Sequence, residues 1–246
     1  MTTSGTPLYD ELLTELKTLA EPTYAQFHRR LLKNDSINVL GVRTPHLRKL
    51  AKRYKDTVPT LLSFPDDYYE VTFIKLQAAA LLPYDSFVKY VDKCVSLIDN
   101  WATCDCFAPK CIAEHRQDFL TYIYSYLGMD GKISATEFTQ RFALTTLLHF
   151  YVEEEWLQTI FDIVQEDVDL DLYYVHMAAA WLIAEVLVKY YEDGVEFLKC
   201  NAECYDKEGK GREFFDIKTH NKAIQKARES FRLTKEQKDF LKGLKR

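Results

Sequence analysis

The strongest constraint on this chain is a long succession of amphipathic segments whose apolar residues recur with the 3.6-residue period of an α-helix. The first segment has leucines at Leu8, Leu12, Leu16 and Leu19. Only 8 glycines and 7 prolines punctuate the 246 residues, which leaves few turn signals for a fold with many strands. The composition, 47% hydrophobic and 14% aromatic, excludes a disordered chain. The sequence therefore predicts an all-α protein with an ample core.

The predicted helices are bounded by prolines, glycines or polar capping residues. They cover residues 8–19, 24–32, 44–54, 66–82, 85–98, 101–109, 116–127, 134–151, 155–165, 173–191, 193–200 and 218–231, with a short helix between Pro59 and Pro65 and a last one from about Thr234. Thr44 and Pro45 are predicted to be the N-cap and the first residue of the basic helix at 44–54. Loops are expected at 128–131 and around Lys207–Gly211.

Helices that follow one another in pairs without strands are typical of a solenoid. Trp101, Arg141 and Trp181 follow one another at steps of 40 residues, and repeats of the HEAT type are about 40–47 residues long. If one repeat equals one such step, these three side chains occupy equivalent positions in a row along one surface. The sequence thus predicts a HEAT-like helical-repeat solenoid that forms a single domain over residues 1–246.

Trp101 and Asp105 are four residues apart, so in a helix they project side by side from one face. Asp99 and Asn100 just before them are good N-cap residues, which places the pair in the first turns of a new helix. An indole face and a carboxylate together suit a cationic, planar ligand, because each attracts positive charge. The same spacing also fits a tryptophan of the core and an aspartate that interacts with the helix dipole. Both interpretations remain open on the spacing alone.

Charge is strongly segregated along the chain, although the net charge is only −5. Residues 28–55 contain nine Lys or Arg and one Asp, and residues 216–246 contain ten Lys or Arg against four Asp or Glu. Residues 153–171 contain eight acidic residues and no basic one. This segregation predicts one positive surface if the fold brings the basic segments together. The alternative is a set of separate, solvated helix faces.

The sequence contains no signal for a membrane span or for secretion. No apolar run approaches about 18–20 residues, and residues 1–6 lack a basic n-region and an apolar h-region. We therefore expect an intracellular protein without membrane contact. The six cysteines form no CxxC pair and have no histidine at ligand spacing, which favours reduced, mostly buried thiols. No metal and no cofactor are expected.

Four passages carry a family resemblance. They are the glycine-containing turn and basic helix at 40–50, the Trp-x-x-x-Asp motif in Asn100–Asp105, the arginine-bearing helix Arg141–Tyr151, and the tryptophan-bearing helix Tyr174–Leu182. In their order and intervals they resemble the AlkD-type DNA alkylation-repair DNA glycosylases, and a basic helix at 219–230 is similar as well. The resemblance covers about residues 28–230. It implies a right-handed HEAT-like solenoid with a concave DNA-binding groove.

The resemblance also implies an activity, which is excision of cationic N3- or N7-alkylated purines from duplex DNA as in base excision repair. Hydrolysis of the N-glycosidic bond would proceed without a covalent intermediate and without full base flipping. By carry-over, Trp101 and Trp181 flank the lesion, Asp105 stabilises positive charge on the sugar and positions the water, and Arg141 holds a backbone phosphate. Electrostatics supports the role of Asp105, because a fixed carboxylate stabilises a developing oxocarbenium ion.

Arg43, Arg48 and Lys52, spaced by four or five residues, are expected to contact flanking phosphates. The expected partner is duplex DNA with alkylated bases, bound by a monomer. Two alternatives stay open: a HEAT-like DNA-binding scaffold without catalysis, and a protein-interaction solenoid that binds a peptide in an aromatic groove. Indoles that face solvent favour the enzyme, whereas indoles inside the core favour a purely structural role.

Overall fold

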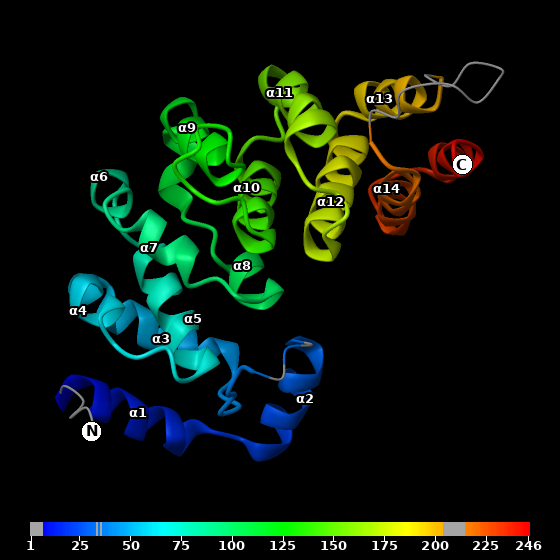
Figure 1. Cartoon of the computed structure of the whole chain (residues 1–246). Helices are drawn as coiled ribbons and strands as arrows, with labels where there is room; N and C mark the ends of the chain where they lie inside the picture. Colours follow the sequence, from blue (N-terminus) through cyan, green and yellow to red (C-terminus); the bar gives the residue numbers. More distant parts are fainter. Residues whose placement is uncertain (1–6, 33, 35, 204–214) are drawn as a thin grey trace. The chain divides into compact units, whose positions relative to one another are not determined.

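The computed structural model describes residues 7–32, 34, 36–203 and 215–246, except for the side chains of residues 202 and 203. Every regular element in this part of the chain is a helix (Figure 1), which confirms the predicted all-α class. The predicted loop around Lys207–Gly211 lies outside the described residues. The chain divides into two units, Met1–His115 and Arg116–Arg246. The prediction of a single domain stays a prediction.

The first unit consists of short helices arranged around one buried helix. They are α1 (Pro7–Leu19), α2 (Pro22–Leu32), α3 (Thr44–Tyr54), α4 (Val58–Leu62), α5 (Tyr69–Ala79), α6 (Tyr84–Phe87), α7 (Val91–Ser96) and α8 (Trp101–Cys106). Nearly all side chains of α5 are buried, and this helix packs against α3, α4, α7 and α8. The core of the first unit is therefore built around α5.

Glu70 of α5 fixes the turn that precedes α3. Its carboxylate is fully buried and accepts hydrogen bonds from the N–H groups of Leu40, Gly41 and Val42 at 2.7–3.2 Å. Gly41 has a φ of 92°, and a Cβ there would lie 2.4 Å from the carbonyl oxygen of Glu21. Only glycine fits this position. A buried anion and a glycine together determine how the chain enters the basic helix α3.

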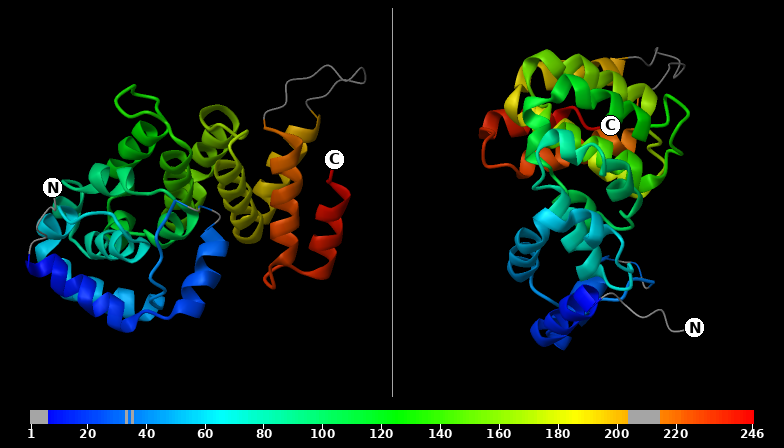
Figure 2. Two further views of the ribbon diagram at one scale, coloured as in Figure 1. Left: turned by 60° about the horizontal axis from the view of Figure 1, so that its bottom comes forward. Right: turned by 90° about the vertical axis from the view of Figure 1, so that its left-hand side faces the viewer.

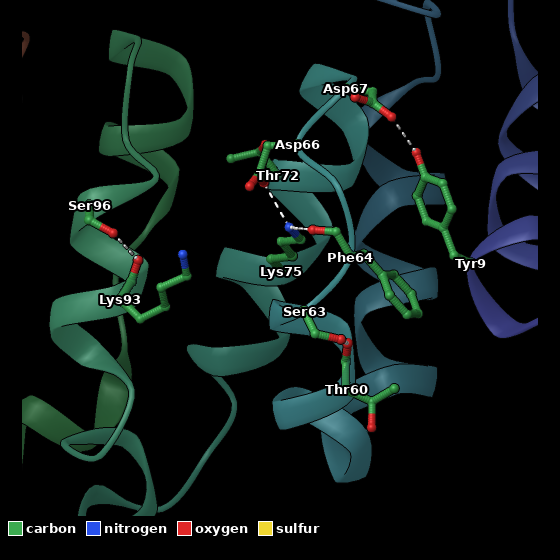
Figure 3. A network of polar contacts seen from close by, with 10 residues as sticks. All are labelled: Tyr9, Thr60, Ser63, Phe64, Asp66, Asp67, Thr72, Lys75, Lys93 and Ser96. Carbon is green, nitrogen blue, oxygen red and sulfur yellow. Dashed lines mark hydrogen bonds and ion pairs between the residues drawn. The ribbon is translucent and has the colours of Figure 1, made fainter. Parts of the chain in front are cut away.

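Lys75 of α5 is a second buried charge, and it holds the loop between α4 and α5 (Figure 3). Its ammonium group donates to the carbonyl oxygen of Phe64 at 2.5 Å and to the carboxylate of Asp66 at 2.7 Å. Burial lowers the pKa of Lys75, and the negative charge of Asp66 opposes this shift. In the same loop Asp67 accepts a hydrogen bond from Tyr9 of α1 at 3.1 Å. The loop is thus attached to two helices of the first unit.

The second unit consists of helices in two layers. They are α9 (Arg116–Tyr126), α10 (Glu137–Phe150), α11 (Leu157–Asp162), α12 (Tyr173–Lys189), α13 (Tyr191–Glu203), α14 (Ile217–Glu229) and α15 (Lys235–Gly243). α10, α12 and α14 form one row, in which each packs against the next, and α9, α13 and α15 lie beside them (Figures 1 and 2). The buried alanines 178–180 let α12 approach its neighbours closely. This repetition confirms the predicted helical-repeat architecture.

Some predicted boundaries are wrong. The helix predicted at 85–98 is divided into α6 and α7 by a turn at 88–90, and the helix predicted at 66–82 shortens to α5. Arg43, and not Thr44, is the N-cap of α3, and no side chain caps that helix. Among the described residues, no helix combines the length and apolarity needed to cross a membrane. None of the five described cysteines forms a disulfide, and only two of them are buried, fewer than the sequence predicted.

Candidate functional site

α8 carries the predicted Trp101–Asp105 pair as its first and fifth residues. Asn100 is the N-cap, as predicted, and its side chain accepts a hydrogen bond from the N–H of Thr103 at 3.0 Å. The indole N–H of Trp101 donates to the carbonyl oxygen of Leu31 in α2 at 3.1 Å. Asp105 follows one turn later on the same face. Both residues of the pair are half-buried, so neither is enclosed in the core, and the indole is oriented by a specific hydrogen bond.

Arg48 of α3 lies near the C-terminal half of α8. Burial raises the pKa of the Cys106 thiol, the positive charge of Arg48 lowers it, and the negative charge of Asp105 raises it. Both charged groups therefore act on the same thiol. The side-chain amide of Gln77 in α5 donates to the carbonyl oxygen of Cys106 at 2.7 Å and fixes the end of α8. The first unit thus combines an aromatic ring, a carboxylate and a predicted phosphate-binding arginine.

Arg43 and Lys52, the other two predicted phosphate contacts of the first unit, are both exposed. Arg43 forms a bidentate ion pair with Glu21, with a shortest N–O distance of 2.7 Å. Its guanidinium group lies 4.1 Å from the centre of the Tyr24 ring. Hydrogen bonding to Arg43 lowers the pKa of Glu21. Arg43 must therefore share or leave this partner if it contacts a phosphate, whereas Lys52 extends from the exposed face of α3.

Arg141 of α10 is only 5% exposed, which the sequence did not predict. Its guanidinium group donates to the carbonyl oxygen of Tyr174 at 2.7 Å and lies 5.7 Å from the centre of the Tyr174 ring. Glu137, one turn earlier in α10, accepts a hydrogen bond from the N–H of Tyr174 at 2.7 Å. The two side chains together attach the first turn of α12 to α10. In this structure Arg141 has a structural task in addition to any contact with DNA.

Trp181 of α12 is half-buried and lines a pocket of about 200 Å³ between α12 and α14. Its indole meets the ring of His149 in α10 edge-on, with ring centres 6.3 Å apart and planes at 80°. Glu185 and Arg232 also line the pocket and form a bidentate ion pair with N–O distances of 2.5 and 2.8 Å. Neither residue was among the predicted site residues. The sequence contains one signal for Glu185, because its spacing from Trp181 repeats that of Asp105 from Trp101.

The prediction that Trp101, Arg141 and Trp181 occupy equivalent helix positions is wrong. They are the first residue of α8, the fifth of α10 and the ninth of α12, because these helices begin at steps of 36 residues rather than 40. Each 40-residue step therefore advances the side chain by about one helical turn. The contacts agree, since Arg141 meets Tyr174 in the first turn of α12, two turns before Trp181.

The predicted site residues divide between the two units. In the first unit the structure brings together Trp101 and Asp105, with Arg48 nearby. In the second unit it places Arg141 and Trp181 on neighbouring helices, but at different levels. A common row of all four residues, and a single positive surface, stay predictions. In the part of the chain that the structure describes, no group of three or more His, Cys, Asp or Glu side chains is placed to hold a metal ion.

The fold and the α8 motif define a class of protein, namely all-α helical-repeat proteins that carry a Trp-x-x-x-Asp pair at a capped helix start. A family model described as DNA alkylation repair enzyme matches residues 12–207. The chain belongs to this family. No curated protein matches it. The match ends before α14 and α15, so these two helices lie beyond the matched residues.

Proposed function

We propose that this protein is a monofunctional DNA glycosylase that removes cationic N3- or N7-alkylated purines from duplex DNA. The observation that carries the proposal is the Trp101–Asp105 pair in a member of the DNA alkylation repair enzyme family. The pair is half-buried, capped by Asn100, and oriented by the hydrogen bond from the indole to Leu31. It is accessible and preorganised, as a catalytic group should be.

Asp105 acts on the sugar in this mechanism. The bond from C1′ to the base nitrogen breaks, and its electron pair goes to the base, which leaves as a neutral molecule because it was already a cation. Positive charge then develops on C1′ and the ring oxygen of the deoxyribose, and a nearby carboxylate stabilises it. The attacking water bonds to C1′ and loses a proton to Asp105 or to solvent. No protonation of the base by an acid is needed.

The aromatic and basic residues bind the DNA. Trp101 and Trp181 present flat, electron-rich faces that attract the cationic base and the sugar. Arg141, Arg43, Arg48 and Lys52 are proposed to neutralise backbone phosphates, which positions the duplex without reading its sequence. For Arg43 this requires exchange of the exposed Glu21 carboxylate for a phosphate oxygen. We further propose that the protein works on DNA as a monomer.

The test is release of 7-methylguanine from a heavily methylated duplex by the purified protein. We expect free base and abasic sites to accumulate with the wild type, and Asp105→Asn to release base about 100-fold more slowly, as is typical when one preorganised electrostatic group is lost. The variant should still bind the duplex, because asparagine has the size of aspartate.

Two results would contradict the proposal. If the wild type binds methylated duplex in a salt-dependent way but releases no base, the protein is a DNA-binding scaffold. If neither release nor DNA affinity is found, a protein-interaction solenoid is the better description. If the wild type and Asp105→Asn release base at equal rates, the protein is still a glycosylase, but Asp105 is not its catalytic carboxylate.

A further inference from the structure

Phe231 is the most exposed large apolar residue of the described chain, with a relative exposure of 101%. It lies in the turn between α14 and α15, beyond the residues that the family model matches. An aromatic side chain gains much free energy when it leaves water, so full exposure of a phenylalanine is unfavourable in the isolated chain. The other exposed aromatic of this region, Phe240 on α15, is 48% exposed and lies under the ammonium group of Lys199.

The turn that presents Phe231 is held on both sides. The N–H of Ser230 donates to the carbonyl oxygen of Ala227 at 3.1 Å, and the N–H of Arg232 donates to the Ser230 hydroxyl at 3.2 Å. Leu233, directly after Arg232, is buried. Fixed neighbours reduce the conformational entropy that Phe231 would lose on binding a partner. The exposure of this ring is therefore a property of a well-defined turn.

The same turn is anchored beside Trp181. Ser230 and Arg232, the two neighbours of Phe231, line the pocket of which Trp181 is one wall. The bidentate ion pair from Arg232 to Glu185 attaches the turn to α12, four residues after Trp181. Figure 2 shows the turn at the end of the neighbouring helices α14 and α15, drawn in orange and red. Phe231 thus lies in the turn whose two flanking residues, Ser230 and Arg232, line the Trp181 pocket.

Basic residues outnumber acidic ones in the segment around Phe231. Residues 226–235 contain four Lys or Arg and one acidic residue, Glu229, and Glu185 of α12 neutralises one of the four, Arg232. Aromatic rings among basic residues are the combination with which proteins contact nucleic acids, because the charges meet phosphates and the ring stacks on bases. Apolar side chains also insert between base steps of duplex DNA and partially unstack them. An apolar tip without surrounding positive charge would instead fit a protein partner.

We propose that Phe231 is a DNA-contacting positioning residue that inserts against a base step beside the nucleotide held at Trp181. This inference rests on the proposed action of the protein on duplex DNA. The inserted ring would unstack the step and hold the duplex in register with the Trp181 pocket. Arg232 acts through the turn, because its ion pair with Glu185 sets where the ring projects.

The test uses a duplex that contains an abasic analogue next to a fluorescent 2-aminopurine, whose emission rises when it is unstacked. The full-length wild type should raise the emission at saturation, and Phe231→Ala should abolish the rise and bind about tenfold more weakly, as expected for the loss of one stacked aromatic. Phe240→Ala is the matched control and should behave as the wild type. Phe231→Ala should melt at the wild-type temperature, since the exposed ring supports no core contact.

Salt and self-association separate the possible outcomes. The salt dependence of DNA binding should be unchanged in Phe231→Ala, because an apolar contact releases no counterions. The inference is overturned if Phe231→Ala keeps both the affinity and the fluorescence rise, or if it only reduces self-association of the protein in sedimentation. This duplex needs no base release, so a protein that excises nothing but shows the Phe231-dependent rise would contradict the proposed glycosylase and support the DNA contact.

Discussion

The molecule contains the same local pair twice, and the two copies differ in what surrounds them. Trp101 and Asp105 are the first and fifth residues of the six-residue α8, whereas Trp181 and Glu185 lie in the middle of the 17-residue α12. Glu185 is bound to Arg232 in a bidentate ion pair. In α12 the carboxylate therefore attaches the turn at Arg232 to the helix. In α8 the carboxylate lies instead near the Cys106 thiol, on which Arg48 also acts.

The indoles also differ in how they are held. The indole N–H of Trp101 donates to a backbone carbonyl of another helix. The indole of Trp181 instead forms a T-shaped contact with the ring of His149. A hydrogen bond fixes the rotation of the first ring more tightly than an edge contact fixes the second. We propose that the α8 pair, whose indole is held by a hydrogen bond, takes part in the chemistry, and that the α12 pair contributes to binding.

The largest expected effect is the difference in base release between variants of the two carboxylates, Asp105 and Glu185. Asp105→Asn should slow 7-methylguanine release by about 100-fold, because it removes a fixed charge beside the developing oxocarbenium ion. Glu185→Gln should change release by no more than about threefold, since a partly exposed ion pair contributes only about 0–1 kcal/mol. Single-turnover release from methylated duplex measures both. A loss in Glu185→Gln as large as that in Asp105→Asn would break the comparison and make α12 an equal catalytic partner.

The second prediction compares the predicted phosphate contacts of the two units. Arg141→Ala should lower the free energy of unfolding by about 1–3 kcal/mol, because the Tyr174 carbonyl oxygen loses its charged donor in a buried setting. Arg43→Ala should leave the melting temperature nearly unchanged, since its partner Glu21 is exposed and can be hydrated. Denaturant titration and duplex binding are the two measurements. If Arg141→Ala is as stable as the wild type but binds DNA weakly, Arg141 is a phosphate ligand with no structural task.

Buried histidines provide a third contrast between the units. Burial lowers the pKa of both His28 and His176. Because the folded state then binds a proton less tightly than the unfolded state, each contributes stability that is full above about pH 6.5 and is lost as the pH falls through the folded pKa. His28 Nδ1 lacks a hydrogen-bond partner among the described residues, whereas His176 Nδ1 lies 2.7 Å from the Thr219 hydroxyl.

Replacement of each histidine by phenylalanine should therefore change the free energy of unfolding at pH 7.5 by different amounts. His28→Phe should be close to neutral, because the ring packs between Tyr24 and Tyr69 and its Nδ1 has no hydrogen-bond partner among the described residues. His176→Phe should cost about 1–3 kcal/mol, because Thr219 loses a buried partner. Urea unfolding at pH 7.5, 6.5 and 5.5 checks both, and His28→Phe should also show a weaker loss of stability in acid. An equal cost at pH 7.5 for both variants would mean that His28 has a polar partner.

The sequence was sufficient for the helices and for the local part of the site. Periodicity located α1, α3 and α9 almost to the residue, and the N-cap Asn100 followed from residue type alone. Prediction failed at 85–98, because the apolar spacing continues through the turn that separates α6 from α7. The spacing of apolar residues indicates which face of a helix is buried. It does not indicate at which residue the backbone hydrogen bonds of the helix end.

The long-range part of the site was not accessible from the sequence. Arg141 meets Tyr174 33 residues later, and Glu185 meets Arg232 47 residues later. Such pairs depend on how each helix is rotated about its axis and on the 36-residue step between helix starts, which the tryptophan and arginine spacing of 40 concealed. The sequence shows that Arg141, Glu185 and Arg232 are charged. Which residue each of them contacts depends on how α10, α12 and α14 pack against one another.

The smallest expected effect concerns the basic residues of α3. It tests whether these residues of the first unit bind backbone phosphates in addition to the chemistry proposed for Asp105. Arg48→Ala and Lys52→Ala should each weaken duplex binding, and each should reduce the slope of log affinity against log salt by about 0.9, the value for one neutralised phosphate. Arg53→Ala on the same helix is the matched control, because Arg53 is paired with Glu15 at 2.7 Å on the side of α1. Unchanged slopes for Arg48→Ala and Lys52→Ala would remove α3 from the interface. The Trp101–Asp105 pair would then depend on other cations, such as those around Phe231, to hold the duplex.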